Sequence, residues 1–217
     1  MKKIFTSILL ILLIPSIQGC ADSSTEAEVI PDEIVIGDIV WMRKNLNVTV
    51  FKNGDSIPKA HNSYEWNQFS KKSQACWSYY NYDENVNPEY GKLYNWHAVN
   101  DIRGLAPKGF HVANLTEWNS MIDLCGGDLK ASAEMRNGTS WSGKVNGNNS
   151  IKFTALPAGF CDEVGEAAGM GISAWWWTIS EKDQLKGIAL SMHNINDAIY
   201  YWASPKSYGS AVRCVKD

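Results

Sequence analysis

The sequence predicts an α+β domain built on an antiparallel β-meander, with two or three short helices and long loops. Two apolar runs flank Gly37 and Asp38, a pattern typical of a tight β-hairpin. Two capping-box sequences follow in the middle of the chain, and short strand-like segments separated by turn residues fill the last third. The chain contains no sequence repeat that would favour a solenoid or propeller.

The first half of the domain is predicted to hold one helix. Asn62 and Glu65 form a capping-box pattern, in which each side chain bonds the backbone N–H of the other, and the helix should run to about Ser70. Around it we expect a hairpin, an irregular segment, an aromatic strand and a polar loop, at residues 33–42, 45–58, 76–82 and 83–91 respectively.

The second half begins with another capping box, formed by Asn114 and Glu117. The helix after it presents one apolar face and should end at Gly126 and Gly127. That face comprises Leu115, Trp118, Met121, Ile122 and Cys125. A weaker helix, a surface loop and five strands should follow, at residues 128–135, 139–150, 151–155, 174–179, 186–192, 198–203 and 211–215.

Length and composition bound the function. A chain of 217 residues with 45% hydrophobic and 20% charged residues suits one globular domain and excludes a disordered chain or a coiled coil. Five acids precede Ile34, and they account for the excess of negative charge in the mature chain. Because the domain from Ile34 onward is formally neutral, it has no net positive field to attract the phosphate backbone of a nucleic acid. We therefore expect no nucleic-acid partner.

The N-terminus predicts export and lipidation. A basic start, an apolar run over residues 4–14, and Ile17, Gly19 and Cys20 together resemble a bacterial lipobox. Residues 1–19 are then the signal peptide and Cys20 the lipid attachment site, in a protein anchored in the bacterial outer membrane and facing the exterior. An ordinary signal peptide with an incidental cysteine is the alternative. Residues 20–33 form an acidic tether, which is either a surface-sorting signal or a plain spacer.

Four cysteines remain after Cys20. An even number in an exported, oxidising compartment predicts two disulfides, with three pairings open. These are Cys76, Cys125, Cys161 and Cys214. Their spacing matches no zinc motif, so we expect no metal and no cofactor.

Several segments resemble the Fibrobacter succinogenes major paralogous domain, over about residues 34–217. They are residues 40–47 (VWMRKNLN), 51–58, 90–101 (YGKLYNWHAVND), 104–112 (GLAPKGFHV), 153–160, 176–181 and 212–217. The resemblance implies a C-type-lectin-like fold on a secreted or lipid-anchored protein and no established molecular function. Cys125 and Cys161 stand where relatives usually lack cysteine. This implies that they pair with each other, leaving Cys76 to Cys214.

The residues predict a non-enzymatic protein. Residues 109–118 also resemble formylglycine-generating oxidases, which bind copper through two neighbouring cysteines near the C-terminus, whereas this chain has only Cys214 there. The calcium and sugar motifs of C-type lectins are missing. Asp83, Asn85 and Asn87 resemble the start of an EF-hand, but Pro88 stands where that loop needs glycine.

Three consecutive tryptophans are the most distinctive feature. In a strand, Trp176 should face the core while Trp175 and Trp177 face the other way. We expect a ligand site at Trp175, Trp177 and Trp202, with amide contacts from Asn194 and Asn196. Two alternatives remain open: the alternation is inverted, or all three tryptophans belong to the core.

The leading hypothesis is a surface lipoprotein that binds a glycan or another cell-surface protein. The alternatives are a structural or adhesive assembly subunit and, less favoured, an enzyme. An exposed aromatic groove favours ligand binding, and an unpaired sheet edge favours assembly. A perturbed acid/base pair in a cleft favours catalysis.

Overall fold

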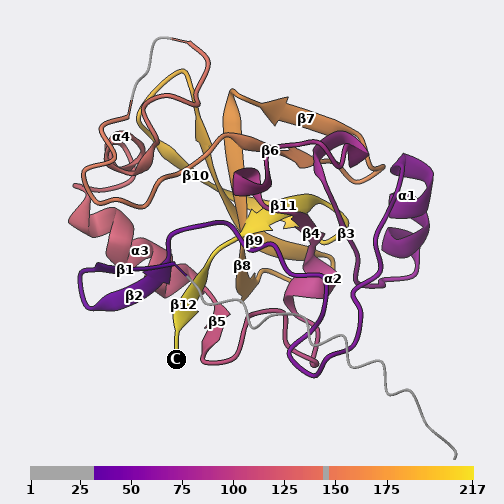
Figure 1. Ribbon diagram of the computed structural model, residues 1–217. Helices are drawn as coiled ribbons and strands as arrows, with labels where there is room; N and C mark the ends of the chain where they lie inside the picture. Colours follow the sequence, from indigo (N-terminus) through magenta and orange to yellow (C-terminus); the bar gives the residue numbers. More distant parts are fainter. Residues whose placement is uncertain (1–31, 144–146) are drawn as a thin grey trace, which may run out of the picture.

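The computed structural model describes residues 32–143 and 147–217, so the signal peptide, Cys20 and most of the tether lie outside it. The described chain is an α+β domain with mostly antiparallel sheets and few short helices, as predicted (Figure 1). A four-stranded sheet has the order β1-β2-β12-β5. An eight-stranded sheet has the order β10-β9-β8-β6-β11-β4-β3, with β7 paired to β6.

The helices are short, as the capping patterns predict. They are α1 (Ser63–Lys71), α2 (Trp96–Val99), α3 (Leu115–Leu124) and α4 (Ala131–Met135), with 3-10 turns at Tyr80–Tyr82 and Pro88–Tyr90. The Asn62 side chain accepts from the Glu65 N–H at 2.9 Å at the start of α1. Asn114 and Glu117 form a complete capping box at α3. Both predicted helix starts are therefore confirmed.

The strands of the first half are the shortest. They are β1 (Glu33–Ile36), β2 (Ile39–Met42), β3 (Trp77–Ser78), β4 (Leu93–Asn95) and β5 (Phe110–Val112). The hairpin of β1 and β2 is confirmed, whereas the aromatic strand predicted over residues 76–82 shrinks to β3 and a 3-10 turn. At Asn81 and Tyr82 the backbone is left-handed, which an extended strand cannot include.

The strands of the second half form most of the large sheet. They are β6 (Ala158–Cys161), β7 (Ala167–Met170), β8 (Ser173–Glu181), β9 (Lys186–His193), β10 (Ile199–Pro205), β11 (Gly209–Val212) and β12 (Cys214–Lys216). The meander of β8, β9 and β10 is antiparallel, and Trp176, Leu190 and Tyr201 lie in register across it. The strand predicted over residues 151–155 is wrong. Positive φ at Lys152 and Thr154 breaks the extended backbone, and Ala155 makes only an isolated bridge to Arg136.

Arg213 divides the predicted strand 211–215 into β11 and β12, which belong to different sheets. Its guanidinium is fully buried and donates to the carbonyls of Met42 (3.0 Å), Arg43 and Phe153 (3.1 Å). It also donates to Asn45 Oδ1 at 2.7 Å, and Asn45 accepts the indole N–H of Trp176 at 2.9 Å. One buried cation thus joins the two sheets through neutral acceptors.

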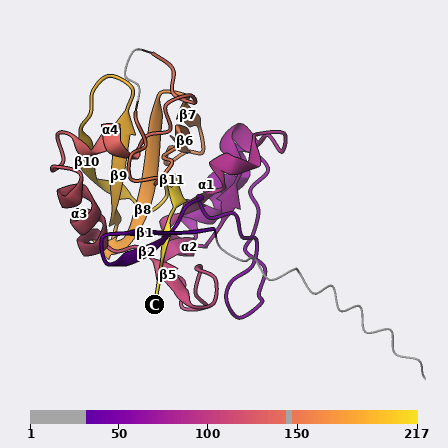
Figure 2. The same cartoon turned by 60° about the vertical axis from the view of Figure 1, so that its left-hand side comes forward.

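The hydrophobic core lies on both faces of β8. On one face Trp176 packs at 5.7 Å from Trp118 of α3, in a cluster with Trp41 and Phe153. On the other face Trp177 lies in a second cluster, together with residues of β3, β4 and β5. Figures 1 and 2 show α3 beside the β8–β9–β10 end of the molecule and α1 at the opposite end.

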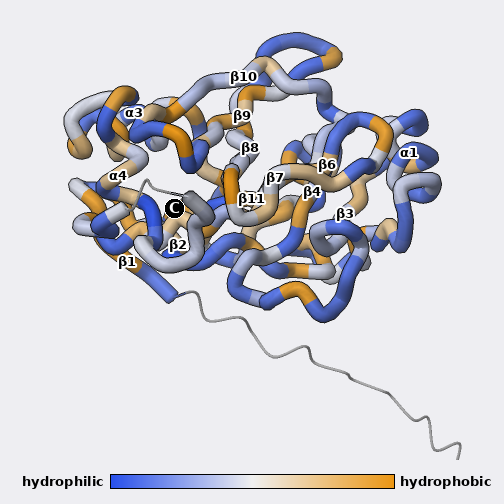
Figure 3. Tube along the Cα trace, turned by 90° about the horizontal axis from the view of Figure 1, so that it is seen from above, coloured by the Kyte–Doolittle hydropathy of each residue, from blue (hydrophilic) through white to orange (hydrophobic). Residues whose placement is uncertain are grey.

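Hydrophobic and hydrophilic residues alternate over short distances along the described chain (Figure 3). In the described residues, no helix is long and apolar enough to cross a membrane.

Candidate functional site

A groove of about 630 Å³ lies between α3 and the outer strand β10. Helix α3 and the residues after it form one wall, and β9, β10 and the turn after β8 form the other. The lining residues are Leu115, Asn119, Ile122, Asp123, Gly127, Asp128, Lys182, Ile188, Tyr201, Trp202 and Ala203.

Local sequence periodicity places these side chains. In α3, Leu115, Asn119 and Asp123 lie four residues apart and share the face that lines the groove, while Trp118 enters the core. This spacing is the signal in the sequence that could have placed Asn119 and Asp123 at a site. Successive residues of β10 alternate between the two faces of the sheet.

Trp202 is exposed yet held in place. Its side chain is 44% exposed, and its indole N–H donates to Ser191 Oγ at 2.8 Å. The ring lies 5.4 Å from that of Trp175, and Ser191 Oγ is 3.1 Å from Nε2 of His193. Because these contacts already fix the rotamer, a ligand that stacks on Trp202 meets an ordered ring.

Tyr201 crosses towards α3 on the other face of the strand. Its hydroxyl donates to Asn119 Oδ1 at 3.1 Å, and its side chain is 42% exposed. Burial, followed by the charges of Asp128 and Asp123, raises the pKa of Tyr201, so the phenol stays a neutral hydrogen-bond donor. In the part of the chain that the structure describes, Asp123, Asp128 and Lys182 form no ion pair.

The expectation that Trp175 and Trp177 are exposed is wrong. Trp177 is fully buried and donates to the Tyr94 carbonyl at 3.0 Å, while Trp175 is 8% exposed beneath Trp202 and 4.9 Å from Phe160. The alternation itself is correct, because Trp176 enters the core on the opposite face. Of the three aromatic residues predicted to form the site, only Trp202 lines the groove.

The two predicted amide contacts serve the protein itself. Asn194 Nδ2 donates to the Ser142 carbonyl at 2.6 Å, and Asn196 Nδ2 donates to the Tyr200 hydroxyl at 2.7 Å. Neither residue lines the groove. Both stabilise the turn between β9 and β10.

The structure does not show the two predicted disulfides. All four cysteines are buried free thiols, and each predicted pair joins cysteines from different hydrophobic clusters. Cys76 and Cys161 share the smallest hydrophobic cluster. Gly209 lies beside Cys161, and the ring of Trp66 packs against this glycine. Burial raises the pKa of Cys161 to about 12, so this thiol is a poor nucleophile.

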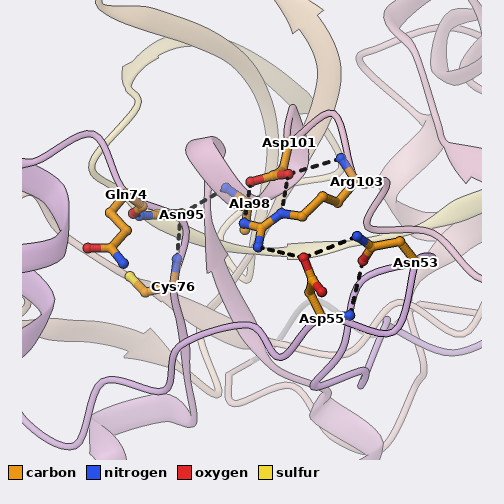
Figure 4. Close-up of polar contacts among 8 residues, drawn as sticks. All are labelled: Asn53, Asp55, Gln74, Cys76, Asn95, Ala98, Asp101 and Arg103. Atoms are coloured by element: carbon orange, nitrogen blue, oxygen red, sulfur yellow. Dashed lines mark hydrogen bonds and ion pairs between the residues drawn. The ribbon is translucent and has the colours of Figure 1, made fainter.

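The family-like segment 90–101 has a structural role (Figure 4). Asn95 accepts from the N–H groups of Cys76 and Ala98 and donates to the Gln74 carbonyl at 2.8 Å. Arg103 pairs with Asp101 at 2.8 Å and reaches Asp55 at 3.4 Å. These contacts fix α2 and the loops around a second, smaller cavity of about 500 Å³ beside Lys52 and His111.

His111 is the one histidine held between two carboxylates in the described residues. Its ring nitrogens lie 2.8 Å from Glu117 Oε1 and 2.9 Å from Asp217 Oδ1. Burial lowers the pKa of His111, but the hydrogen bonds to Asp217 and Glu117 outweigh burial and raise it. Within the described ranges, no group of His, Cys, Asp and Glu side chains is arranged to hold a metal ion.

Comparison with known protein families gives one match, the Fibrobacter succinogenes major domain, over residues 34–216. Comparisons with curated proteins and with solved structures give no match. The matched region holds both sheets except for Glu33 at the start of β1, the four described helices and every residue of the groove. The chain therefore belongs to the Fibrobacter succinogenes major domain family.

Proposed function

We propose that this protein is a non-enzymatic lipoprotein of the bacterial outer membrane. Cys20 carries the lipid, the acidic tether spans from the membrane, and a domain of C-type-lectin-like fold faces the exterior and binds another cell-surface molecule. The lipobox-like sequence before Cys20 supports the anchor. The short helices, long loops and antiparallel sheets support that fold.

The groove between α3 and β10 is the binding site in this proposal. The observation that carries it is a pair of exposed aromatic residues, Tyr201 and Trp202, on a strand that also borders carboxylates, and these carboxylates form no ion pair within the described residues. Aromatic rings fixed in one rotamer bury a large area at low entropic cost. Unpaired charges at the rim give specificity.

A catalytic role has less support. Ser191 and His193 lie within hydrogen-bond distance, as a nucleophile and base must. However, Ser191 is fully buried and accepts the indole N–H of Trp202, so a substrate cannot reach its hydroxyl. The pair instead holds Trp202 in position.

The binding proposal is tested with the full chain, purified in detergent, on arrays of glycans and cell-surface proteins. Trp202→Ala should abolish the strongest signal. Tyr64→Ala is the matched control, because Tyr64 is 72% exposed on α1, far from the groove (Figure 1). Equal signals from both variants and the unaltered protein would contradict a binding site in the groove.

The anchor has its own test. Replacing Cys20 by Ala should abolish labelling by a fatty-acid probe and release the protein from the membrane fraction. Labelling that persists in this variant would refute the lipid attachment site.

An assembly subunit is the second candidate. Strand β10 lies at the end of the large sheet, and a sheet end exposes backbone groups that can pair with another chain.

A further inference from the structure

Strand β10 directs alternate backbone groups towards β9 and away from it. The N–H of Ile199 donates to the Asp128 carbonyl at 2.6 Å and therefore points away from β9. By alternation, the N–H and C=O groups of Tyr201 and Ala203 point the same way. The partner strand agrees: the carbonyl of Ile188, opposite Ala203, accepts from Thr178 Oγ1 of β8 at 2.9 Å.

These outward N–H and C=O groups of Tyr201 and Ala203 form a short unpaired stretch of strand edge, which we call the open window. In the described chain, no hydrogen bond reaches the outward N–H or C=O of Tyr201 or Ala203. The window is closed at one end by the contact of Ile199 with Asp128 and at the other by Pro205, which has no N–H.

The opposite end of the same sheet is covered. In β3, the N–H of Trp77 donates to the Pro58 carbonyl at 3.0 Å, and its carbonyl accepts from Ala60 at 2.9 Å. Of these two ends of the sheet, only β10 leaves an open window, and there it borders the groove.

We propose that the groove binds an extended segment of a partner protein, which pairs with β10 as an added strand. This inference rests on the proposed binding function and names its ligand class. Two outward residues offer two N–H and two C=O groups at strand spacing, which matches a polypeptide backbone. A glycan has no such repeat of donors and acceptors.

The walls of the groove define which segment fits. Side chains of an added strand alternate, so every second one enters the groove against Leu115, Ile122 and Ile188. Two carboxylates, Asp123 and Asp128, line the groove together with one cation, Lys182, and none of the three forms an ion pair with another described residue. The complementary segment therefore carries an apolar and a basic residue on one face, and Trp202 contacts the other.

The test begins with random decapeptides displayed on phage and selected against the full chain in detergent. The dissociation constant of a selected peptide is measured for the unaltered chain and two variants. Ala203→Pro removes one outward N–H, and a lost hydrogen bond should weaken binding about tenfold. Ala203→Val keeps that N–H, so it should bind the peptide several-fold more tightly than Ala203→Pro does. Equal affinities for Pro and Val variants would overturn the strand-addition model.

If Ala203→Pro does not fold, amide hydrogen exchange of the unaltered chain tests the same inference. With the unaltered chain, a bound peptide should slow exchange at Tyr201 and Ala203 and leave Tyr200 and Trp202 unchanged. Unchanged exchange at Tyr201 and Ala203 would overturn the inference. A different result would be that no peptide is selected while a glycan binds the unaltered chain and not Trp202→Ala. That result would overturn the strand-addition inference and leave the proposed binding function intact.

Discussion

Two strands of one sheet each carry three consecutive aromatic residues, and the two sets differ in burial. In β8, Trp175, Trp176 and Trp177 are all buried, whereas Tyr200, Tyr201 and Trp202 in β10 are all exposed. The two segments are alike in sequence but differ in sheet order: β8 lies between β9 and β6, and β10 is the last strand.

Neighbours that are distant in sequence decide which of the two aromatic segments is buried. On β8, α3 covers one face and the strands of the first half cover the other. On β10, only β9 lies alongside, and α3 leaves a groove. The same aromatic pattern thus builds a core at the centre of the sheet and an exposed aromatic surface at its edge.

The largest expected effect is at the centre. Trp176→Ala should destabilise the domain by about 3–5 kcal/mol, because it removes a fully packed ring and leaves a cavity. It also removes the indole N–H that bonds Asn45, next to the buried Arg213. Urea unfolding of the full chain measures the loss. A loss below about 1 kcal/mol would mean that the ring is not packed as described.

The matched change at the edge should cost far less stability. Trp202→Ala loses a contact with Trp175 and a hydrogen bond to Ser191, and we expect about 1 kcal/mol. The same urea experiment compares the two variants directly. Equal losses at Trp176 and Trp202 would remove the distinction between core and edge.

The smallest expected effect is the pH dependence of stability that His111 contributes, away from the aromatic segments of β8 and β10. The pKa of His111 is raised above its ordinary value near 6.5, so its stabilising contribution is fully present below pH 6.5 and is lost as pH rises through the folded pKa. Because the side chain is 41% exposed, we expect less than about 1 kcal/mol.

The measurement compares the unfolding free energies of the unaltered chain and His111→Gln between pH 5.5 and 8.5. The advantage of the unaltered chain should shrink as pH rises. An advantage that grows with pH would contradict the contacts to Glu117 and Asp217.

Local patterns predicted local structure well. The hairpin at Gly37 and the helix starts at Asn62 and Asn114 depend on a few neighbouring residues, and all three are confirmed. The capping box is complete only at Asn114, because the Glu65 side chain accepts from the N–H of His61 and not from that of Asn62. The prediction over residues 151–155 was wrong because its apolar residues fit a strand while the backbone at Lys152 and Thr154 is left-handed. Short strands such as β4 and β7 give too few residues for a periodic pattern.

The site could be predicted only in part. Trp202 was identified from its aromatic neighbours, but the exposure of Trp175 and Trp177 depends on the order of strands, which no local pattern specifies. The free thiols of Cys125 and Cys161 lie in separate clusters for the same reason. Asp123 and Asp128 line the same groove as Lys182 only because α3 packs beside the meander.

Amide hydrogen exchange of the ligand-free chain distinguishes an open β10 edge beside the groove from an edge that another segment covers. We predict slow exchange at Tyr200, Trp202 and Ser204, whose N–H groups bond β9, and fast exchange at Tyr201 and Ala203, whose N–H groups face solvent. Slow exchange at all five would show that another segment covers the edge, and it would contradict the account.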